Sequence, residues 1–423
     1  MPPAAAAMGA VVEPALPIGD VPMLGVEPMA TGVPELDRVL GGGVVPGSVT
    51  LLGGEPGVGK STMLLQALAG LAASGRRVLY VSAEESAHQV RRRAERLDAV
   101  HPEVYLATDT TLTAVLTHVR EVGPAVAVVD SIQSLHDPAL ASAPGSVAQV
   151  RHCAHSLVVE AKSSDLAIVV VGHVTKEGAL AGPRVLEHVV DTVLSFEGER
   201  DLPLRTLRAS KHRFGATGEI GLLAMTEGGL GAVPDPSAMF LADRRPGVAG
   251  SVVVATIEGR RPVLVEVQAL VAPTNQPHAR RSVQGLDAGR VGMVLAVLER
   301  RAELPLAAAD TYAIAVGGAK VVEPAADLGV ALALVSSWAG VAVPDDVVVC
   351  GELGLGGELR RVGNLEARLS EAARLGFRRA LVAASSPPVD VGLTVIGVGS
   401  IHEAVDALHD GAEVGRRGET PPR

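Results

Sequence analysis

The sequence predicts an α/β protein whose first half has a mainly parallel sheet and whose second half is an α+β domain. Four short, valine-rich apolar runs follow one another in the first half, namely GSVTLLGG, RRVLYVSA, AVAVVDS and AIVVVGHV. Runs that are apolar throughout fit central parallel strands covered on both faces. The segments KSTMLLQALAGLAASG and SAHQVRRRAERL have helical spacing, so strands and helices alternate along this half.

A turn-rich stretch at residues 235–250 divides the two halves, and we interpret it as a linker. Before it, PLRTLRASKHR and EIGLLAMTEGGLGAV predict antiparallel strands added at one edge of the first sheet. After it, SVVVATIEGRRPVLVEVQALV predicts two strands, and further helical and strand patterns complete the second half. We therefore expect domains at residues 27–234 and 251–423, preceded by a mobile Pro/Ala-rich tail at residues 1–26.

Composition narrows the class of protein. At 423 residues and 48% hydrophobic content the chain can form two or three domains, and no apolar stretch is long enough to span a bilayer. A net charge of −10 argues against a protein that coats nucleic acid through bulk charge. The start of the chain lacks a secretory pattern, and its two cysteines, Cys153 and Cys350, lie far apart. We expect a cytoplasmic protein with no membrane segment and no cysteine-based zinc site.

The stretch GGEPGVGKST fits the phosphate-loop pattern G-x-x-x-x-G-K-[ST] over residues 54–61. An expected strand precedes it and an expected helix opens at its lysine, which is the context that the pattern requires. Glycines let backbone N–H groups surround phosphate oxygens, while Lys60 reaches the β/γ-phosphates and Ser61 ligates Mg²⁺. The predicted ATP-binding residues are Gly54, Glu55, Pro56, Gly57, Val58, Gly59, Lys60, Ser61 and Thr62.

Further polar residues follow the carboxyl ends of the expected parallel strands. Asp130 ends AVAVVD and would face the phosphate loop and hold Mg²⁺ through water; the alternative is a helix N-cap before SIQSL. Glu84 and Glu85 follow RVLYVSA, and we choose Glu84 as the base that activates water, while one of the pair can cap the next helix. His173 ends AIVVVGH, where it can sense the γ-phosphate or simply form a strand-tip hydrogen bond.

Together these segments resemble bacterial RadA (also called Sms), a family of RecA-like ATPases of recombinational repair. The resemblance is carried by TGVPELDRVLGGGVVPGSVTLLGGEPGVGKSTMLLQ, VLYVSAEESAHQVRRRAERL, VVDSIQSL and SKHRFGATGEIG, and it extends to EPAADLGVALAL. It implies a cytoplasmic, ring-forming ATPase, expected to be a hexamer, that binds single-stranded and branched DNA. It also implies branch migration of strand-exchange intermediates made with RecA. Family members usually begin with a four-cysteine zinc finger, which this sequence lacks through loss or a misplaced gene start.

The resemblance also assigns roles to single residues. Glu84 falls where RecA-like folds keep the catalytic glutamate, and His173 falls at their γ-phosphate sensor. Lys176 and Arg184 lie on the loop that would face DNA in the central channel, where cations contact phosphates without reading sequence. The alternative for this pair is that both are ordinary exposed loop charges.

The segment KHRFG at residues 211–215 resembles the family's K-N-R-F-G signature, with His212 in place of the usual asparagine. In hexameric RecA-like helicases a Lys-x-Arg pair near this point reaches the γ-phosphate of the neighbouring subunit. Lys211 and Arg213 alternate along the expected strand, so both should project to one face. A trans arginine contributes ~10³–10⁵ in rate. The alternatives are an edge strand guarded by cations, or a contact with DNA instead of ATP.

The second half resembles the peptidase domain of Lon, which cleaves with a Ser–Lys dyad. On that pattern EPAADLGVA places Ala326 at the serine, and GNLEARL places Glu366 at the lysine. Lys320 is the one lysine after residue 250, so a relocated dyad would have to use it. We expect an inactive, Lon-protease-like platform for assembly or DNA contact, with RRPGVAG and HARRS as candidate basic contacts. A non-motor ATP-binding switch is the alternative to a motor, and an ATP-dependent peptidase is disfavoured.

Overall fold

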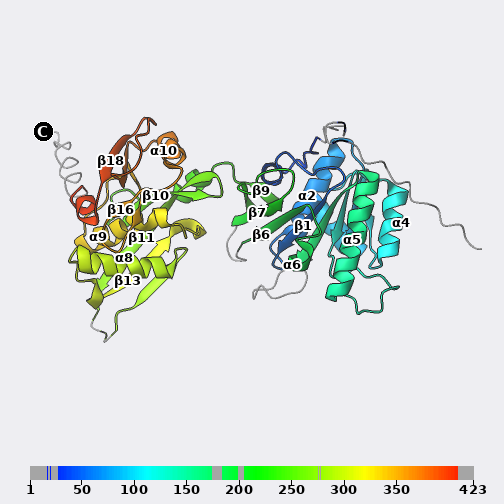
Figure 1. Ribbon diagram of the computed structural model, residues 1–423, viewed down its shortest axis with the longest axis horizontal. Helices are drawn as coiled ribbons and strands as arrows, with labels where there is room; N and C mark the ends of the chain where they lie inside the picture. The colour runs from blue at the N-terminus through cyan, green and yellow to red at the C-terminus, as the bar shows by residue number, and fades with distance from the viewer. Residues whose placement is uncertain are drawn as a thin grey trace, which may run out of the picture.

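The computed structural model describes residues 17, 20, 27–173, 183–198, 204–274, 276 and 278–407. Over these residues the chain forms two domains, which lie side by side along the longest axis of the molecule (Figure 1). The N-terminal domain is built on a nine-stranded sheet, and the C-terminal domain is built on a seven-stranded sheet.

The sheet of the N-terminal domain is mainly parallel, as the valine-rich runs predict, and its strand order is β3-β2-β4-β5-β1-β6-β7-β8-β9. Six strands run parallel to one another: β1 (Val49–Gly54), β2 (Val78–Ser82), β3 (Val104–Ala107), β4 (Val126–Asp130), β5 (Ala167–His173) and β6 (Thr192–Glu197). Three strands continue the sheet in antiparallel fashion: β7 (Leu204–His212), β8 (Ile220–Thr226) and β9 (Gly229–Ala232). The antiparallel strands lie at one edge, where the sequence predicts them.

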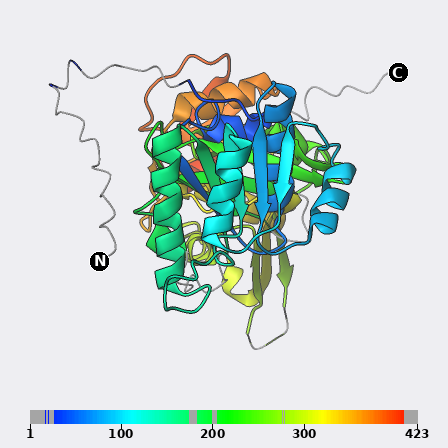
Figure 2. The same cartoon turned by 90° about the vertical axis from the view of Figure 1, so that its right-hand side faces the viewer.

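Helices cover both faces of this sheet and stand alongside its strands (Figure 2). One face packs against α1 (Pro34–Val39), α2 (Lys60–Ala73) and α3 (Ala87–Arg96). The other face packs against α4 (Leu112–Val122), α5 (Val147–Ser164) and α6 (Pro183–Leu186). Side chains define where two of these helices begin, because Ser86 and Gln89 form a capping box at α3 and Ser146 caps α5. The central strands are thus buried on both faces.

The C-terminal domain is an α+β unit with the strand order β12-β13-β11-β10-β14-β17-β18. These strands are β10 (Ser251–Glu258), β11 (Arg261–Pro273), β12 (Arg281–Gln284), β13 (Ala309–Ala315), β14 (Val347–Cys350), β17 (Arg379–Ala383) and β18 (Thr394–Val398). A separate two-stranded sheet is formed by β15 (Glu352–Leu353) and β16 (Leu359–Arg360). Helices α8 (Ala288–Arg301) and α9 (Asp327–Ala339) contribute to the larger core of this domain, and α10 (Leu365–Arg374) contributes to a smaller one. Three 3-10 turns complete it: η2 (Leu306–Ala308), η3 (Val316–Gly318) and η4 (Pro324–Ala326).

The stretch that we expected to be a linker contains helix α7 (Pro236–Leu241), which packs on the C-terminal domain. Phe240 belongs to the core of that domain, and the hydroxyl of Ser237 donates a hydrogen bond to Glu371 at 2.6 Å. Asp235 pairs with Arg374 at 2.8 Å. This packing favours a domain boundary between β9 and α7.

The hairpin between β10 and β11 reaches from the C-terminal domain to the N-terminal domain. Glu258 pairs with Arg208 of β7 at 2.6 Å, and Arg261 approaches the buried Glu35 of α1 at 3.4 Å. Gly259 forms the tip with a φ of 63°, and a Cβ atom there would lie 2.3 Å from the carbonyl oxygen of Gly218. Only glycine fits that close approach. The hairpin therefore fixes the two domains to each other beside β7 and β8.

Candidate ATP-hydrolysis site

The phosphate loop lies between β1 and α2 at the carboxyl edge of the parallel sheet, as the sequence predicts. Gly57 and Gly59 have φ angles of 83° and 113°, a region that favours glycine, so the backbone can turn its N–H groups inward. Gly54 is also required, because a Cβ atom there would lie 2.4 Å from the carbonyl oxygen of Phe196. Helix α2 begins at Lys60, and its N-terminal N–H groups face the loop. The loop can hold a polyphosphate.

Lys60 is buried beneath this loop. Its Nζ atom donates hydrogen bonds to the carbonyl oxygens of Gly54 at 2.7 Å and Glu55 at 3.0 Å. Burial lowers the pKa of Lys60, although the carboxylates of Asp130 and Glu84 act in the opposite direction. A buried ammonium gains from a nearby anion, so phosphate oxygens are favourable partners for it.

Ser61 and Asp130 meet beside the loop and form the part of the site that fits a magnesium ion. The hydroxyl of Ser61 donates to Oδ2 of Asp130 at 2.6 Å, and the hydroxyl of Tyr80 donates to the same oxygen at 2.6 Å. Burial and the charge of Asp130 raise the pKa of Tyr80, so the phenol keeps its proton. Hydroxyl and carboxylate oxygens are ligands that Mg²⁺ prefers. Turns, not a helix, directly follow Asp130, so it is no helix N-cap there.

Glu84 and Glu85 follow β2, but they point to different partners. Glu84 accepts hydrogen bonds from the hydroxyls of Ser131 and, at 3.0 Å, Ser134, which both lie just after β4. Glu85 is held instead by both terminal nitrogens of Arg93 in α3, at 2.6 and 2.7 Å. These hydrogen bonds place Glu84 beside the end of β4 that carries Asp130, whereas Glu85 binds α3 through Arg93.

Lys211 and Arg213 both bind the turn that precedes β6. The Nζ atom of Lys211 donates to the carbonyl oxygens of Glu187 and Val190, each at 2.7 Å, and Nη1 of Arg213 lies 2.9 Å from Asp191. A β-bulge in β7 opposite β6 changes the direction of Lys211. The two cations thus share one turn, and the bulge, which lies before both of them, leaves their two-residue spacing unchanged.

This turn lies at the amino ends of the parallel strands, whereas the phosphate loop of the same chain lies at their carboxyl ends. Asp191 accepts a hydrogen bond at 3.1 Å from the backbone N–H of Val49, the first residue of β1, whereas the loop follows Gly54, the last. A strand of this length spans roughly 16 Å between those residues. Because of this separation, Arg213 cannot serve the site of its own chain without a large rearrangement. Its side chain is half exposed at this end of the sheet.

The other predicted site residues are located only in part. The backbone of His173 ends β5 and lies next to Gly54 in the sheet, but its side chain and that of Arg184 are not among the described atoms. Lys176 lies outside the described residues. Ala326 is buried in η4, directly before α9, and Glu366 is exposed on α10.

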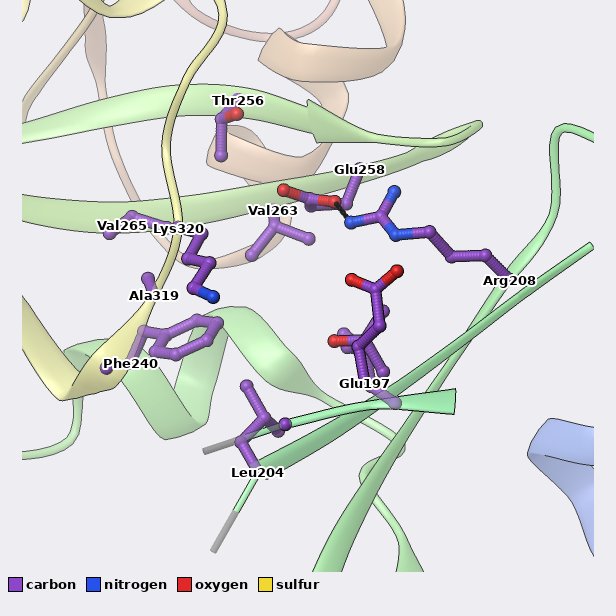
Figure 3. Close-up of a pocket in the computed structure, with 14 residues that line it drawn as sticks. Glu197, Leu204, Arg208, Phe240, Thr256, Glu258, Val263, Val265, Ala319 and Lys320 are labelled. Carbon is purple, nitrogen blue, oxygen red and sulfur yellow. Dashed lines mark hydrogen bonds and ion pairs between the residues drawn. The ribbon is translucent and has the colours of Figure 1, made fainter. Parts of the chain in front are cut away.

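Lys320 lines a pocket between the two domains (Figure 3). Lys320 and Phe240 lie on one side of this pocket, and the paired Arg208 and Glu258 lie on the other, together with Glu197. No serine occurs among the described residues that line it. Among the described lining residues the pocket that holds Lys320 therefore offers no serine for a Ser–Lys dyad, and its side-chain hydroxyls are those of Thr206 and Thr256.

Sequence reasoning missed the residues that orient the predicted ones. Tyr80 supports Asp130, Ser131 supports Glu84, Asp191 supports Arg213, and Arg205 binds the phosphate loop through the carbonyl oxygen of Val58 at 3.0 Å. A tyrosine inside an apolar strand run needs a hydrogen-bond partner, so Tyr80 could have been found. Nothing in the local pattern indicates the partners of the others.

The fold and the site define the class of the protein as a P-loop ATPase with a RecA-like α/β core. Residues 24–179 match the family model described as an AAA domain, which binds ATP, and residues 313–386 match the model described as subunit ChlI of Mg-chelatase. A KaiC-like protein of known structure from Pyrococcus horikoshii covers 49% of this chain and 100% of its own, with 19% identity and a TM-score of 0.41.

Relatives that match about nine-tenths of the chain identify the family. The DNA repair protein RadA of Pseudomonas aeruginosa is 51% identical over 382 residues, which cover 90% of this chain and 84% of that protein. The corresponding protein of Streptococcus pneumoniae is 48% identical, covering 92% of this chain and 93% of its own. The chain belongs to the RadA family of DNA repair proteins. Within the described part of the chain, no helix is long and apolar enough to cross a membrane.

Proposed function

We propose that the protein is a DNA-dependent ATPase that promotes branch migration of recombination intermediates made with RecA. The observation that carries the proposal is the meeting of Lys60, Ser61, Asp130 and Glu84 at one edge of the sheet, in a chain of a DNA repair family. Its substrates are ATP with Mg²⁺ and single-stranded or branched DNA.

Hydrolysis follows from the groups at this edge. The loop N–H groups hold the phosphates, and Lys60 exchanges loop carbonyls for β/γ-phosphate oxygens. Mg²⁺ held by Ser61 and, through water, by Asp130 would neutralise charge on those oxygens. Glu84, oriented by the hydroxyls of Ser131 and Ser134, positions the attacking water and accepts its proton. His173 ends β5 next to the loop, where it would sense the γ-phosphate.

The site is completed by a second copy of the chain in a homo-oligomeric ring, expected to be a hexamer. Lys211 and Arg213 lie at the edge of the sheet away from their own loop, so they can serve the γ-phosphate of the neighbouring subunit. Their charge would stabilise the transition state there. An isolated monomer should therefore be a poor ATPase.

DNA would pass the segment that carries Lys176 and Arg184, whose cations suit phosphate contacts without sequence preference. Arg184 belongs to helix α6 and not to the loop on which it was expected from the sequence. The C-terminal domain would serve as a platform for assembly or DNA contact. Neither Ala326 nor Glu366 supplies the hydroxyl or the amine of a peptidase dyad, and no serine lines the described pocket around Lys320. The C-terminal domain is therefore proposed to be inactive as a peptidase.

Three-strand branch migration with the wild-type chain and with Lys60→Ala tests this function. The proposal expects the wild type to extend RecA-made joints in the presence of ATP and Lys60→Ala to leave them unchanged. Equal extension by both would refute an ATP-driven motor. ATP binding and turnover by the wild type without any extension would favour the non-motor switch.

A further inference from the structure

Arg205 is a buried cation that the reaction as proposed above does not use. It is 4% exposed at the start of β7, and its Nε atom donates a hydrogen bond to the carbonyl oxygen of Val58 at 3.0 Å. Nη1 donates to the carbonyl oxygen of Leu204 at 2.9 Å. Burial of a guanidinium is costly, so the contact that directs this one to the phosphate loop calls for a reason.

The carbonyl of Val58 belongs to the phosphate loop, and its orientation affects the nucleotide. Val58 lies between Gly57 and Gly59, whose positive φ angles leave this part of the loop free of side-chain constraints. In a trans peptide the C=O and the following N–H point in opposite directions. When Arg205 holds the oxygen of Val58 toward β7, it turns the N–H of Gly59 the other way, toward the phosphate side.

The same strand carries the proposed trans cations at its other end. β7 runs antiparallel to β6, with Thr206 opposite Glu197 near the phosphate loop and His212 opposite Thr192 at the far edge. Arg205 and Lys211 are therefore separated by roughly 20 Å of strand. β8 pairs with β7 from Leu204 to Arg208, and β6 pairs with it from Thr206 to His212, so the strand is held along its length except at the bulge before Lys211.

We propose that Arg205 is a positioning residue that couples the phosphate loop of one subunit to the cations serving the next. When nucleotide in the loop shifts the Val58 peptide, Arg205 passes the shift along β7 to Lys211 and Arg213. Arg205 therefore has a local role, aiming the N–H of Gly59, and a remote role, setting the two cations at the far edge. The remote role rests on the proposed trans mechanism, whereas the local role does not.

The local role is tested by the affinity of the full-length chain for a fluorescent ATP analogue. Glu84→Gln serves as the background, so that hydrolysis does not obscure binding. Arg205→Met removes the donor at similar volume and should weaken binding about 10-fold, the usual effect of losing a hydrogen bond to a charged group. Arg205→Lys keeps a donor and should recover part of the loss.

Arg208→Met, on the same strand but paired with Glu258, is the control and should bind as the background does. Unchanged affinity in folded Arg205→Met would refute the local role.

The remote role is tested in mixed rings of Glu84→Gln and Arg213→Ala subunits, at ATP concentrations that saturate both. In such rings only the Arg213→Ala subunits keep the catalytic glutamate, and each works with the cations of a Glu84→Gln neighbour that still binds nucleotide. Arg205→Met is added to the Glu84→Gln subunit, which hydrolyses little ATP itself, so purely local damage there costs no turnover. Coupling through β7 should lower the turnover of the mixture about 2- to 30-fold.

Unchanged turnover with Arg205→Met in the Glu84→Gln subunit would overturn the remote role, and Arg205→Lys in the same place provides a second, milder variant should the first fail to fold. If the parent mixture without any Arg205 change shows no turnover, the trans mechanism itself fails and the remote role falls with it. The affinity measurement still decides the local role in that case.

Discussion

Arg213 and Asp191 form an ion pair at the edge of the sheet opposite the phosphate loop, with 2.9 Å between Nη1 and Oδ1. The Asp191 side chain is 6% exposed, whereas that of Arg213 is 50% exposed. The second oxygen of Asp191 accepts the N–H of Val49, so the carboxylate is fixed to the start of β1. The guanidinium is thus anchored on one side and open to solvent on the other, which suits contact with a neighbouring subunit.

The first prediction concerns complementation between subunits. Lys60→Ala and Arg213→Ala should each lose most ATP turnover alone, the second by ~10³–10⁵ if the arginine acts on the transition state. Mixed together they should recover activity, because random mixing in a head-to-tail ring places an intact loop against an intact arginine at roughly a quarter of interfaces. Turnover of separate and mixed preparations is the measurement. A mixture as inactive as its parts would mean that Arg213 acts elsewhere.

The second prediction separates the two adjacent glutamates. Glu84→Gln should lower turnover by about 10²-fold or more while keeping nucleotide affinity, because the base is lost but the loop is intact. Glu85→Gln is the matched control and should mainly weaken the link to Arg93 in α3, with turnover near that of the wild type. Single-turnover hydrolysis and analogue binding measure both. The reverse pattern would exchange the two roles.

The third prediction concerns the hydroxyl of Tyr80. Tyr80→Phe removes the hydrogen bond to Asp130, so the carboxylate is oriented less well for a magnesium ion. Loss of such an orienting partner typically weakens metal affinity 10- to 100-fold. The concentration of Mg²⁺ that gives half-maximal turnover should therefore rise, while Tyr105→Phe, on the partly exposed Tyr105, should leave it unchanged. No change with Tyr80→Phe would show that Asp130 needs no such support.

The fourth prediction concerns acid stability. Burial raises the pKa of Glu323, but hydrogen bonds from Arg368 and other donors outweigh it, so the pKa is lowered overall. A lowered pKa in the folded state gives stability that is present above the ordinary range of a glutamate and is lost as the pH falls through the folded value.

Glu323→Gln removes this titration. In urea unfolding of the full chain, the stability advantage of the wild type should be largest near pH 7 and should shrink below about pH 4. Glu366→Gln, on an exposed residue of the neighbouring α10, is the control and should show no such trend. An advantage that stays constant with pH would contradict the assignment.

The parts of the structure that follow from local pattern were predictable. The valine runs gave β1, β2, β4 and β5, because strands buried on both faces must be apolar throughout. The positions of Lys60, Asp130 and Glu84 at one edge followed from the parallel direction of those strands.

Other features depend on contacts between distant segments. Glu84 and Glu85 both follow β2, so the local sequence does not show which of them is the base. Their hydrogen-bond partners, Ser131 for Glu84 and Arg93 for Glu85, show the difference. The helix α7 was hidden in a turn-rich stretch, since its packing on the second domain outweighs its weak helical pattern. The bulge in β7 likewise has no local signal, yet it sets the direction of Lys211.

In the function proposed above, DNA governs ATP hydrolysis at the carboxyl ends of β1 and β4. The most direct test of this control is the steady-state ATP turnover of the assembled wild-type chain with and without single-stranded DNA, with Lys60→Ala measured beside it. The account predicts a several-fold rise on adding DNA for the wild type and negligible turnover for Lys60→Ala in both conditions. Wild-type turnover that is the same with and without DNA would contradict it.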